Sequence, residues 1–509
     1  NNVYDISMMT LKMNRKRVLF IATFPPPIHG SAMVSQQIKD SKLINEAFDG
    51  DYVNLGTSRK MEEIGKGGIW ITLKKLGRFA GSFFKTFGLL LTRRYDLCYC
   101  AITCHGSGFL KDAPFVLLCK MFGRKIVIHQ HNKGMAKDVD RPVYRWLLPM
   151  VYRHAKVILL SWHLYSDIEK VVDKKDVLIC PNGIKPTVDP NFKREPNVVP
   201  HILFLSNLLI DKGVLVLLDA LKILKEKGYS FVCDFVGSET KDIDAVRFAN
   251  EVERRGLNSI AVYHGRKYGT EKDAYFKQTD AFVLPSFNEA FPLVNQEAME
   301  YKLPIISTNV GGIPDEVKDG DSGFVVEPQD SNALADAICK LIGDAQLRRK
   351  MGDKAYALFR ENFTQDHFEE SFVGALKNVR GGGKSLTMVN YWGRKYGCDK
   401  EEYWRTADVF VFPTLNEAFG LVLLEAMEHG LPCIGTDEGG INDIIDNGKT
   451  GFIVPSGNAE SLSDSIGKLL NDSRLRESMG DCGRNVFVQR YTDLVFEEKM
   501  LCILNQIVS

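Results

Sequence analysis

The sequence predicts an α/β protein with two facing domains, each a parallel sheet covered by helices, followed by a repeated part of the second domain. Short, continuous apolar segments alternate with helical patterns along the chain, which is typical of doubly wound parallel sheets. The alternation is interrupted over residues 182–200, and a second alternating series follows, which indicates a second domain. The motifs of residues 263–376 then return in the same order from Tyr391, which indicates an internal duplication.

The first domain is expected over residues 15–195. Its apolar segments have the length and composition of strands that are buried on both faces. Helical patterns lie between them, so this part of the chain is expected to form one doubly wound sheet. The four segments are residues 17–23, 97–102, 125–129 and 156–161.

The second domain is expected over residues 196–376, and a flexible, glycine-rich linker over residues 377–390. The linker contains Gly-Lys-Ser, but it lacks the preceding strand and the earlier glycine of a phosphate-binding loop. Residues 391–509 are expected to form a partial copy of the second domain. The strands of the second domain are expected at residues 201–205, 231–236, 281–284 and 305–307.

The repeat matches Glu289 and Glu297 with Glu417 and Glu425, and about half of the aligned positions are identical. The second copy has no preceding strand with a Lys-Gly motif and no N-terminal domain of its own, so its open sheet edge requires a cover. It is expected to dock on the first copy, to pair with another chain, or to compete with the first copy for the domain that begins at residue 201. A fusion remnant without function is an equally open interpretation.

Composition excludes several classes of protein. The net charge of +1 gives no electrostatic support for a nucleic-acid partner. No apolar segment reaches the roughly 18 residues that span a bilayer, and no signal peptide is visible. The eleven cysteines lie mostly in apolar segments without a CxxC pair, so reduced, buried thiols are expected. The sequence therefore predicts a cytoplasmic protein.

Polar residues follow two strands of the first domain. Residues 25–32 form a proline- and glycine-containing turn that leads into a helix, where the backbone at Gly30 and Ser31 can approach a ligand closely. An ordinary tight turn explains the same pattern. His131 lies in a polar cluster after another strand, and since no third ligand is spaced for a metal, hydrogen bonding is expected of it.

In the second domain, Asn207 and Lys212 lie between a strand and a helix, where a lysine beside free N–H groups suits a diphosphate. A solvated surface lysine is the alternative. Further along, Glu289 follows a strand and Glu297 lies inside the next helix. Two carboxylates in these places suit the sugar and ribose hydroxyls on either side of a diphosphate. The residues between them include Phe291, Pro292 and Leu293, with proline suited to the first helical turn.

These motifs, with Gly-Gly-Ile-Pro and Gly-Phe-Val-Val after them, resemble the retaining glycosyltransferases of family 4, which have the GT-B fold. The resemblance implies that Glu297 binds the ribose of a nucleotide-sugar and Glu289 the hydroxyls of the transferred sugar. It implies that Lys212 holds the diphosphate and that His131 and Gly30 face the donor sugar and the acceptor.

The family usually has an arginine five residues before the lysine, where this chain has Asn207, and Arg266 or Lys267 is the candidate to compensate. The resemblance also implies transfer with retention by front-face displacement, in which the leaving diphosphate helps to take the acceptor proton. No carboxylate is spaced as a double-displacement nucleophile. No cofactor and no metal are expected.

Residues 64–95 contain no Asp or Glu. Basic and aromatic residues at helical spacing predict a helix that lies on an anionic membrane, at the inner face of the cell membrane. The alternative is that the aromatic residues pack into the core and the cations are solvated. The stretch contains Lys66, Lys74, Lys75, Arg78, Lys85, Arg93 and Arg94 beside Trp70, Phe79, Phe83, Phe84 and Phe87.

The sequence therefore predicts a glycosyltransferase that moves a sugar from a nucleotide-sugar to a glycan or lipid-linked acceptor, as in bacterial capsule or O-antigen synthesis. Two other functions stay open. A sugar-nucleotide epimerase on the same fold is one, and a carbohydrate- or nucleotide-binding protein without catalysis is the other.

Overall fold

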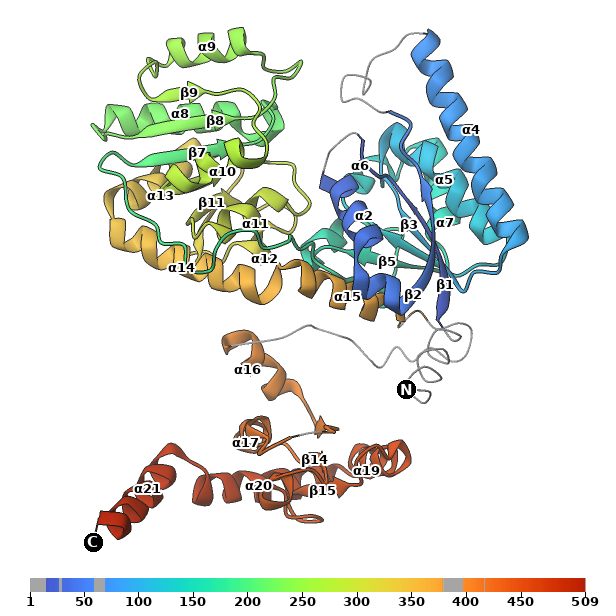
Figure 1. The fold of residues 1–509 in the computed structure, drawn as a ribbon, viewed down its shortest axis with the longest axis vertical. Helices are drawn as coiled ribbons and strands as arrows, with labels where there is room; N and C mark the ends of the chain where they lie inside the picture. Colours follow the sequence, from blue (N-terminus) through green and yellow to red (C-terminus); the bar gives the residue numbers. More distant parts are fainter. Residues whose placement is uncertain are drawn as a thin grey trace, which may run out of the picture. The chain divides into compact units, whose positions relative to one another are not determined.

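The computed structural model describes residues 15–26, 30–58, 69–377, 379, 397–415 and 417–508. The chain divides into two compact units, residues 1–393 and residues 394–509, which are described separately below. The expected linker lies outside the described residues apart from Lys377 and Val379, as do Tyr391 and Lys66. Figure 1 shows the elements with their labels.

The first unit begins with a six-stranded parallel sheet in the order β2-β1-β3-β4-β5-β6, as its apolar segments predict. Alternate residues of each strand face opposite layers of helices. Leu19 and Ile21 of β1 pack toward one layer, and Val18 and Phe20 toward the other. The strands are β1 (Lys16–Ala22), β2 (Phe48–Asn54), β3 (Leu97–Ala101), β4 (Ile126–His129), β5 (Ala155–Leu159) and β6 (Val177–Ile179).

Helices cover both faces of this sheet (Figure 1). One layer contains α4, whose Phe79 and Phe83 pack against Phe115 of α5. The other contains α2, whose Val34 and Ile38 pack with Val18 and Phe20. The helices are α2 (Gly30–Asp40), α3 (Lys42–Ala47), α4 (Ile69–Thr92), α5 (Gly106–Met121), α6 (Met135–Asp138) and α7 (Pro142–Tyr152), with short 3-10 turns η2 (Trp162–Asp167) and η3 (Lys174–Asp176).

The second sheet is also parallel, in the order β12-β11-β10-β7-β8-β9. The strand order reverses between β7 and β10, and a crevice at such a point is where ligands bind in open α/β sheets. The strands are β7 (His201–Leu205), β8 (Val232–Val236), β9 (Ala261–Tyr263), β10 (Ala281–Leu284), β11 (Ile305–Thr308) and β12 (Gly323–Val326). The helical elements are η4 (Ile210–Lys212), α8 (Val214–Glu226), α9 (Ala245–Arg254), α10 (Gly269–Gln278), α11 (Leu293–Glu300), α12 (Ile313–Glu316), α13 (Ser331–Gly343), α14 (Ala345–Asn362) and α15 (Gln365–Lys377).

The chain crosses between the two domains twice. It first crosses after β6, and it returns before α15, which packs on the N-terminal domain. Phe372 of α15 is fully buried with its ring centroid 5.2 Å from that of Tyr99 on β3. The two crossings touch, because Ile184 donates its N–H to Phe363 O (2.9 Å) and accepts from Gln365 N (2.8 Å). Although α15 follows the elements of the second domain in the chain, it packs on the N-terminal domain.

The second unit contains a three-stranded parallel sheet in the order β13-β14-β15. Its elements follow the order of α10 to α15 and β10 to β12 in the first unit. Gly439 repeats a close approach of the first unit, since a Cβ there would collide with Glu417 O as one at Gly311 would with Glu289 O. The elements are α16 (Gly397–Thr406), β13 (Phe410–Phe412), α17 (Leu421–Glu428), β14 (Cys433–Thr436), α18 (Ile441–Ile444), β15 (Gly451–Val454), α19 (Ala459–Asn471), α20 (Ser473–Arg490) and α21 (Asp493–Val508).

Candidate functional site

An ion pair between Lys212 and Glu289 lies at the carboxyl ends of β7 and β10, where the strand order reverses. Lys212 ends the 3-10 turn η4, two residues before α8. Gly213 has φ 78°, and a Cβ at this position would collide with Pro285 O, so a residue without a side chain is needed there. The structure therefore brings together two of the predicted site residues, and each charge neutralises the other.

Backbone contacts hold the two loops of this pair together. Phe287 N donates to Asp211 O (3.0 Å), and Ser286 Oγ donates to the same oxygen (2.9 Å). The loops after β7 and β10 therefore form one rigid rim. A rim of this kind fixes the backbone next to Lys212 and Glu289, while their side chains can still change partner.

Glu297 forms a second ion pair at this edge of the sheet. Its Oε1 lies 2.8 Å from Nζ of Lys272 on α10, and both side chains are more than two thirds buried. Sequence reasoning missed Lys272, because helical periodicity does not show contacts between two helices. The repeat contained a signal, since Lys400 has the same spacing from Glu425, and these two residues also form an ion pair.

The N-terminal domain approaches this rim at the starts of two helices. A Cβ built on Gly30, the first residue of α2, would lie 3.9 Å from Leu293, the first residue of α11. Phe291 is 5% exposed and packs edge-on against Phe363, with ring centroids 5.8 Å apart. Pro292 was predicted in the first turn of α11 but stands one position earlier, as its N-cap. The missing N–H of proline is harmless at either place.

His131 lies in the loop after β4, and its ring centroid is 4.0 Å from that of His129. His129 is fully buried, and Nδ1 of its ring lies 2.8 Å from Tyr99 Oη. Burial, with a smaller effect of His131, holds the pKa of His129 well below its usual range. The following residues are fixed by Asp167, whose carboxylate accepts N–H groups from three consecutive residues, Gly134, Met135 and Ala136.

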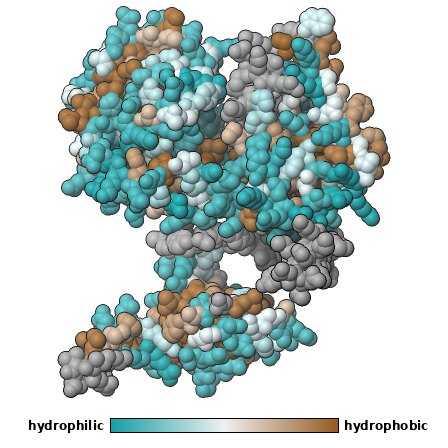
Figure 2. Space-filling model, in the orientation of Figure 1, coloured by the Kyte–Doolittle hydropathy of each residue, from teal (hydrophilic) through white to brown (hydrophobic). Residues whose placement is uncertain are grey.

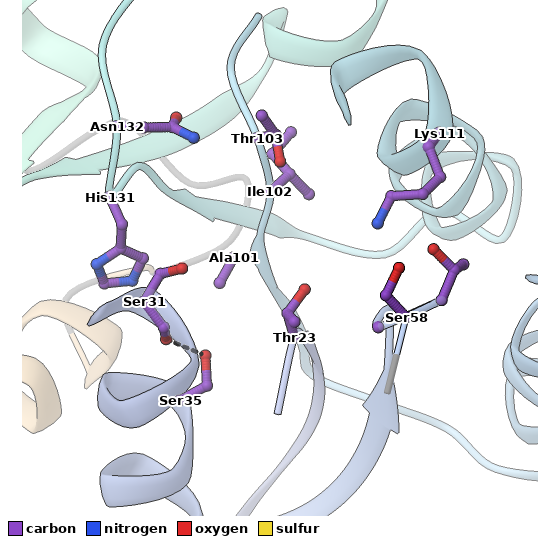
Figure 3. A pocket seen from close by; sticks show the side chains of 12 residues that line it. Thr23, Ser31, Ser35, Ser58, Ala101, Ile102, Thr103, Lys111, His131 and Asn132 are labelled. Atoms are coloured by element: carbon purple, nitrogen blue, oxygen red, sulfur yellow. Dashed lines mark hydrogen bonds between the residues drawn. The ribbon is translucent and has the colours of Figure 1, made fainter. Parts of the chain in front are cut away.

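A cavity of about 300 Å³ opens at the carboxyl ends of β1, β3 and β4 in the N-terminal domain (Figure 3). His131 and Ser31 line one side, and Lys111 of α5 lies on the opposite side. Ser31 also accepts a hydrogen bond at its carbonyl from Ser35 Oγ (2.9 Å). The remaining lining residues are Thr23, Ser35, Gly56, Thr57, Ser58, Ala101, Ile102, Thr103 and Asn132.

Asn207 and Arg266 stand in neighbouring loops of the second domain. Asn207 is exposed and its Oδ1 accepts from Ser238 N at 3.3 Å, so it orders the loop after β8. That loop is tied to the next one, because Gly237 N donates to Gly265 O (3.0 Å). The guanidinium of Arg266 is exposed and lies 4.3 Å from the centroid of the Tyr268 ring.

One contact across the domains involves residues that were not predicted, because Ser161 Oγ, after β5, donates to Asp315 Oδ2 (2.5 Å) at the start of α12. Lys133 belongs to the polar cluster around His131. Burial lowers its pKa, while the charges of Asp167 and Glu289 oppose that shift.

Within the described residues, no group of three or more His, Cys, Asp and Glu side chains has an arrangement that could hold a metal ion. None of the helices described is long and apolar enough to cross a membrane.

Comparison with known proteins identifies the family. The model of the family "Glycosyl transferases group 1" matches residues 188–358 and 385–486, together more than half of the chain. The capsular polysaccharide biosynthesis glycosyltransferase CapM of Staphylococcus aureus is 32% identical over 184 residues, which are 35% of this chain and 47% of that protein. A D-inositol 3-phosphate glycosyltransferase of Paenarthrobacter aurescens is 32% identical over 42% of this chain and 55% of its own length. The chain thus spans about half the length of these relatives.

Solved structures show the same fold at low identity. Sucrose-phosphate synthase of Thermosynechococcus elongatus has a TM-score of 0.56 at 18% identity, over 72% of this chain and 99% of that chain. HepE of Anabaena, in complex with UDP and glucose, has a TM-score of 0.54 at 17% identity, over 72% of this chain and all of its own. The predicted fold of two Rossmann-like domains, as in GT-B proteins, is confirmed. The chain belongs to the group 1 family of glycosyl transferases.

Proposed function

We propose that this chain transfers a sugar from a nucleotide-sugar donor to a glycan or lipid-linked acceptor, with retention at the anomeric carbon, as in glycosyltransferase family 4. The observation that carries the proposal is the pair of lysine–carboxylate contacts at one sheet edge, Lys212 with Glu289 and Lys272 with Glu297. Two cations and two carboxylates near the point where the strand order reverses suit the phosphates and hydroxyls of a nucleotide-sugar. A capsule enzyme and a lipopolysaccharide N-acetylglucosaminetransferase among the relatives support surface-glycan synthesis as the setting.

In this proposal, donor binding rearranges the Lys212–Glu289 pair. Lys212 turns to the diphosphate, and Glu289 is released to accept hydroxyl groups of the transferred sugar. Glu297 accepts the ribose hydroxyls, with Lys272 holding its carboxylate in place. As the bond to the sugar breaks, negative charge grows on the leaving phosphate, where Lys212 and the N-terminal N–H groups of α8 stabilise it.

The acceptor reacts from the side of the N-terminal domain. Gly30 and Leu293 bring α2 close to the donor rim, and His131 lines the cavity behind it. Front-face displacement needs the acceptor hydroxyl on the same face as the leaving diphosphate, which then takes the acceptor proton. Neither a metal nor an enzyme nucleophile is required by this scheme.

The second unit is, in our proposal, a partial duplicate of residues 269–377. Its element order, its Lys400–Glu425 pair and its glycine contacts support a common origin with the first copy. Glu417 is arranged differently, since its carboxylate accepts N–H groups at the start of α17 instead of pairing with a lysine. Nothing in the described part of this unit takes the place of β7 and Lys212, so it is not expected to bind a donor alone.

The acceptor is proposed to be reached at an anionic membrane surface through α4. Phe79 and Phe83 face the core, but other large apolar side chains of this helix are exposed: Trp70, Leu73, Leu76, Phe84, Phe87 and Leu91. All six recur at spacings of three, four or eight residues and so share one side of the helix. Figure 2 shows apolar side chains along this outer edge.

α7 also exposes large apolar side chains, Val143, Trp146 and Met150, which are 57–79% exposed. Lys120 at the end of α5 joins this helix to the same layer, because its Nζ donates to Met150 O (2.7 Å). Aromatic and aliphatic residues beside basic ones suit the interface of an anionic bilayer.

The experiment that tests the function incubates the purified chain with a panel of nucleotide-sugars and a membrane extract that contains lipid-linked glycans. Transfer of a labelled sugar to the glycan, with the α or β configuration of the donor kept in the product, is the expected result. Conversion of the donor to its epimer would establish the alternative enzyme class. Binding of a nucleotide-sugar without hydrolysis or transfer would establish a non-catalytic binding protein.

A further inference from the structure

The cavity of the N-terminal domain is lined by hydroxyl groups and a cation, without a carboxylate among its lining residues. Six of the lining residues are serine or threonine, and one is a lysine. This composition contrasts with the donor rim, where Glu289 and Glu297 supply the acceptors that neutral sugar hydroxyls need. A group that brings its own acceptor oxygens and negative charge therefore matches the cavity better than a neutral sugar does.

Lys111 is held with its ammonium group toward the cavity (Figure 3). Nζ donates to Leu55 O (3.2 Å) and lies 3.1 Å from Asp112 Oδ1. Asp112 is buried behind it, with its other oxygen accepting from Thr103 N (3.0 Å). An ammonium group has three protons, and these two contacts leave one of them for a ligand. The buried carboxylate therefore fixes the lysine from behind and does not enter the cavity.

The same cavity adjoins the helix of the proposed membrane surface. Arg78 of α4 donates to Thr57 O at 2.7 Å, and Ser82 Oγ donates to Asn54 O at 2.7 Å. Both acceptors lie at or just after the end of β2, in the segment that reaches Thr57 and Ser58 in the cavity wall. The cavity therefore lies between α4 on one side and His131, which faces the donor domain in the proposed function, on the other.

We infer that this cavity binds a phosphate group of the acceptor, with Lys111 as its cation and the serine and threonine hydroxyls other than that of Ser35 as further donors. The inference rests on the proposed function, because it names the class of acceptor: a glycan that carries a phosphate ester. A lipid phosphate at the membrane and a free sugar phosphate share this chemistry. The position next to α4 places the lipid end of such an acceptor toward the membrane helix and its sugar end toward His131.

Direct binding tests the inference without requiring transfer. Farnesyl phosphate, glucose 1-phosphate and the uncharged octyl glucoside are titrated into the full chain by calorimetry. Both phosphates are expected to bind, and octyl glucoside at least tenfold more weakly; tighter binding of farnesyl phosphate would identify a lipid as the source of the phosphate. Equal affinity for octyl glucoside and the two phosphates would overturn the inference.

Three variants identify the residue. Lys111→Gln is expected to weaken the binding of both phosphates by at least tenfold. Ser58→Asp adds a negative charge to the cavity wall and is expected to weaken their binding by the same factor, while Lys111 remains as the partner of Asp112. Lys120→Gln is the matched control, since this lysine of α5 also donates to backbone carbonyls, at the far end of the helix. Phosphate binding that survives both Lys111→Gln and Ser58→Asp in chains with normal thermal unfolding would refute the assignment.

Hydrolysis of the nucleotide-sugar donor, measured on the same variants, separates this inference from the proposed function. Unchanged hydrolysis with lost phosphate binding places the defect in the acceptor cavity alone. Absent hydrolysis and absent transfer in the unmodified chain would contradict the proposed function, while the calorimetric result would still decide whether the cavity binds phosphate.

Discussion

Replacing the two partners of the Lys212–Glu289 ion pair one at a time is expected to change nucleotide affinity in opposite directions. The pair is well buried, with side chains 22% and 13% exposed, and Lys212 is engaged by Glu289. A nucleoside diphosphate must therefore displace Glu289 before its phosphates reach the lysine. Glu289→Gln keeps the shape of the competitor but removes its charge. A competition that is weaker by about 1 kcal/mol corresponds to about fivefold tighter binding of the diphosphate.

Replacing the other partner, Lys212→Gln, is expected to weaken diphosphate binding by tenfold or more, because a charge-assisted hydrogen bond of about 1.5–3 kcal/mol is lost. Calorimetric titration with UDP and GDP measures both affinities, and thermal unfolding shows whether each variant is folded. Turnover should fall in Lys212→Gln beyond the change in affinity, since the leaving phosphate carries most charge in the transition state. If both variants weaken the diphosphate by similar factors, the two residues do not compete, and the proposed rearrangement is wrong.

Three further outcomes are expected. Glu297→Ala should weaken donor binding by about 1–3 kcal/mol, because buried ribose hydroxyls lose a charged acceptor. Glu425→Ala in the repeat should leave donor binding unchanged. Calorimetry that shows the reverse would place the working site in the second copy. A chain truncated after Val379 should keep its transferase activity, and a folded but inactive product would show that the repeat is required. Replacing Lys74 and Lys75 by glutamate should release the protein from anionic vesicles in a sedimentation assay, since each cation contributes about 1 kcal/mol near such a surface. Sedimentation that is insensitive to both the substitutions and added salt would exclude α4 as the membrane contact.

The sheets could be predicted from sequence because strands buried on both faces are apolar throughout. The exception is instructive. The spacing of the repeat matches Ala281 with Val409, but β13 begins one residue later, at Phe410. In the first copy, the strand starts earlier, at Ala281, and this residue pairs with Ile202 of β7. The second unit has no counterpart of β7 among its described residues, so the pairing that extends the strand is lost. A strand boundary thus depends on a neighbour that is distant in sequence.

The candidate site could be predicted in part, because some of its residues lie close to the ends of strands that the sequence pattern shows. Lys212 and Glu289 lie in the loops after strands, and Glu297 lies in the helix that follows Glu289. The ends of parallel strands meet at one edge, so local pattern was enough to select them. Lys272 acts through a contact with another helix, and Ser161 through a contact with the other domain, which no local pattern shows. The packing of α15 on the N-terminal domain could not be predicted either, because the pattern of an amphipathic helix does not reveal which of two domains it covers.

That packing determines where everything after residue 377 is attached. α15 ends against the first strand of the protein, with Lys16 Nζ donating to Lys377 O at 3.3 Å. The repeat resembles the second domain in sequence, yet the helix that precedes it along the chain is packed on the N-terminal domain. Changes to the chain at residue 377 therefore act first on the N-terminal sheet beside β1, and not on the second domain whose motifs the repeat shares.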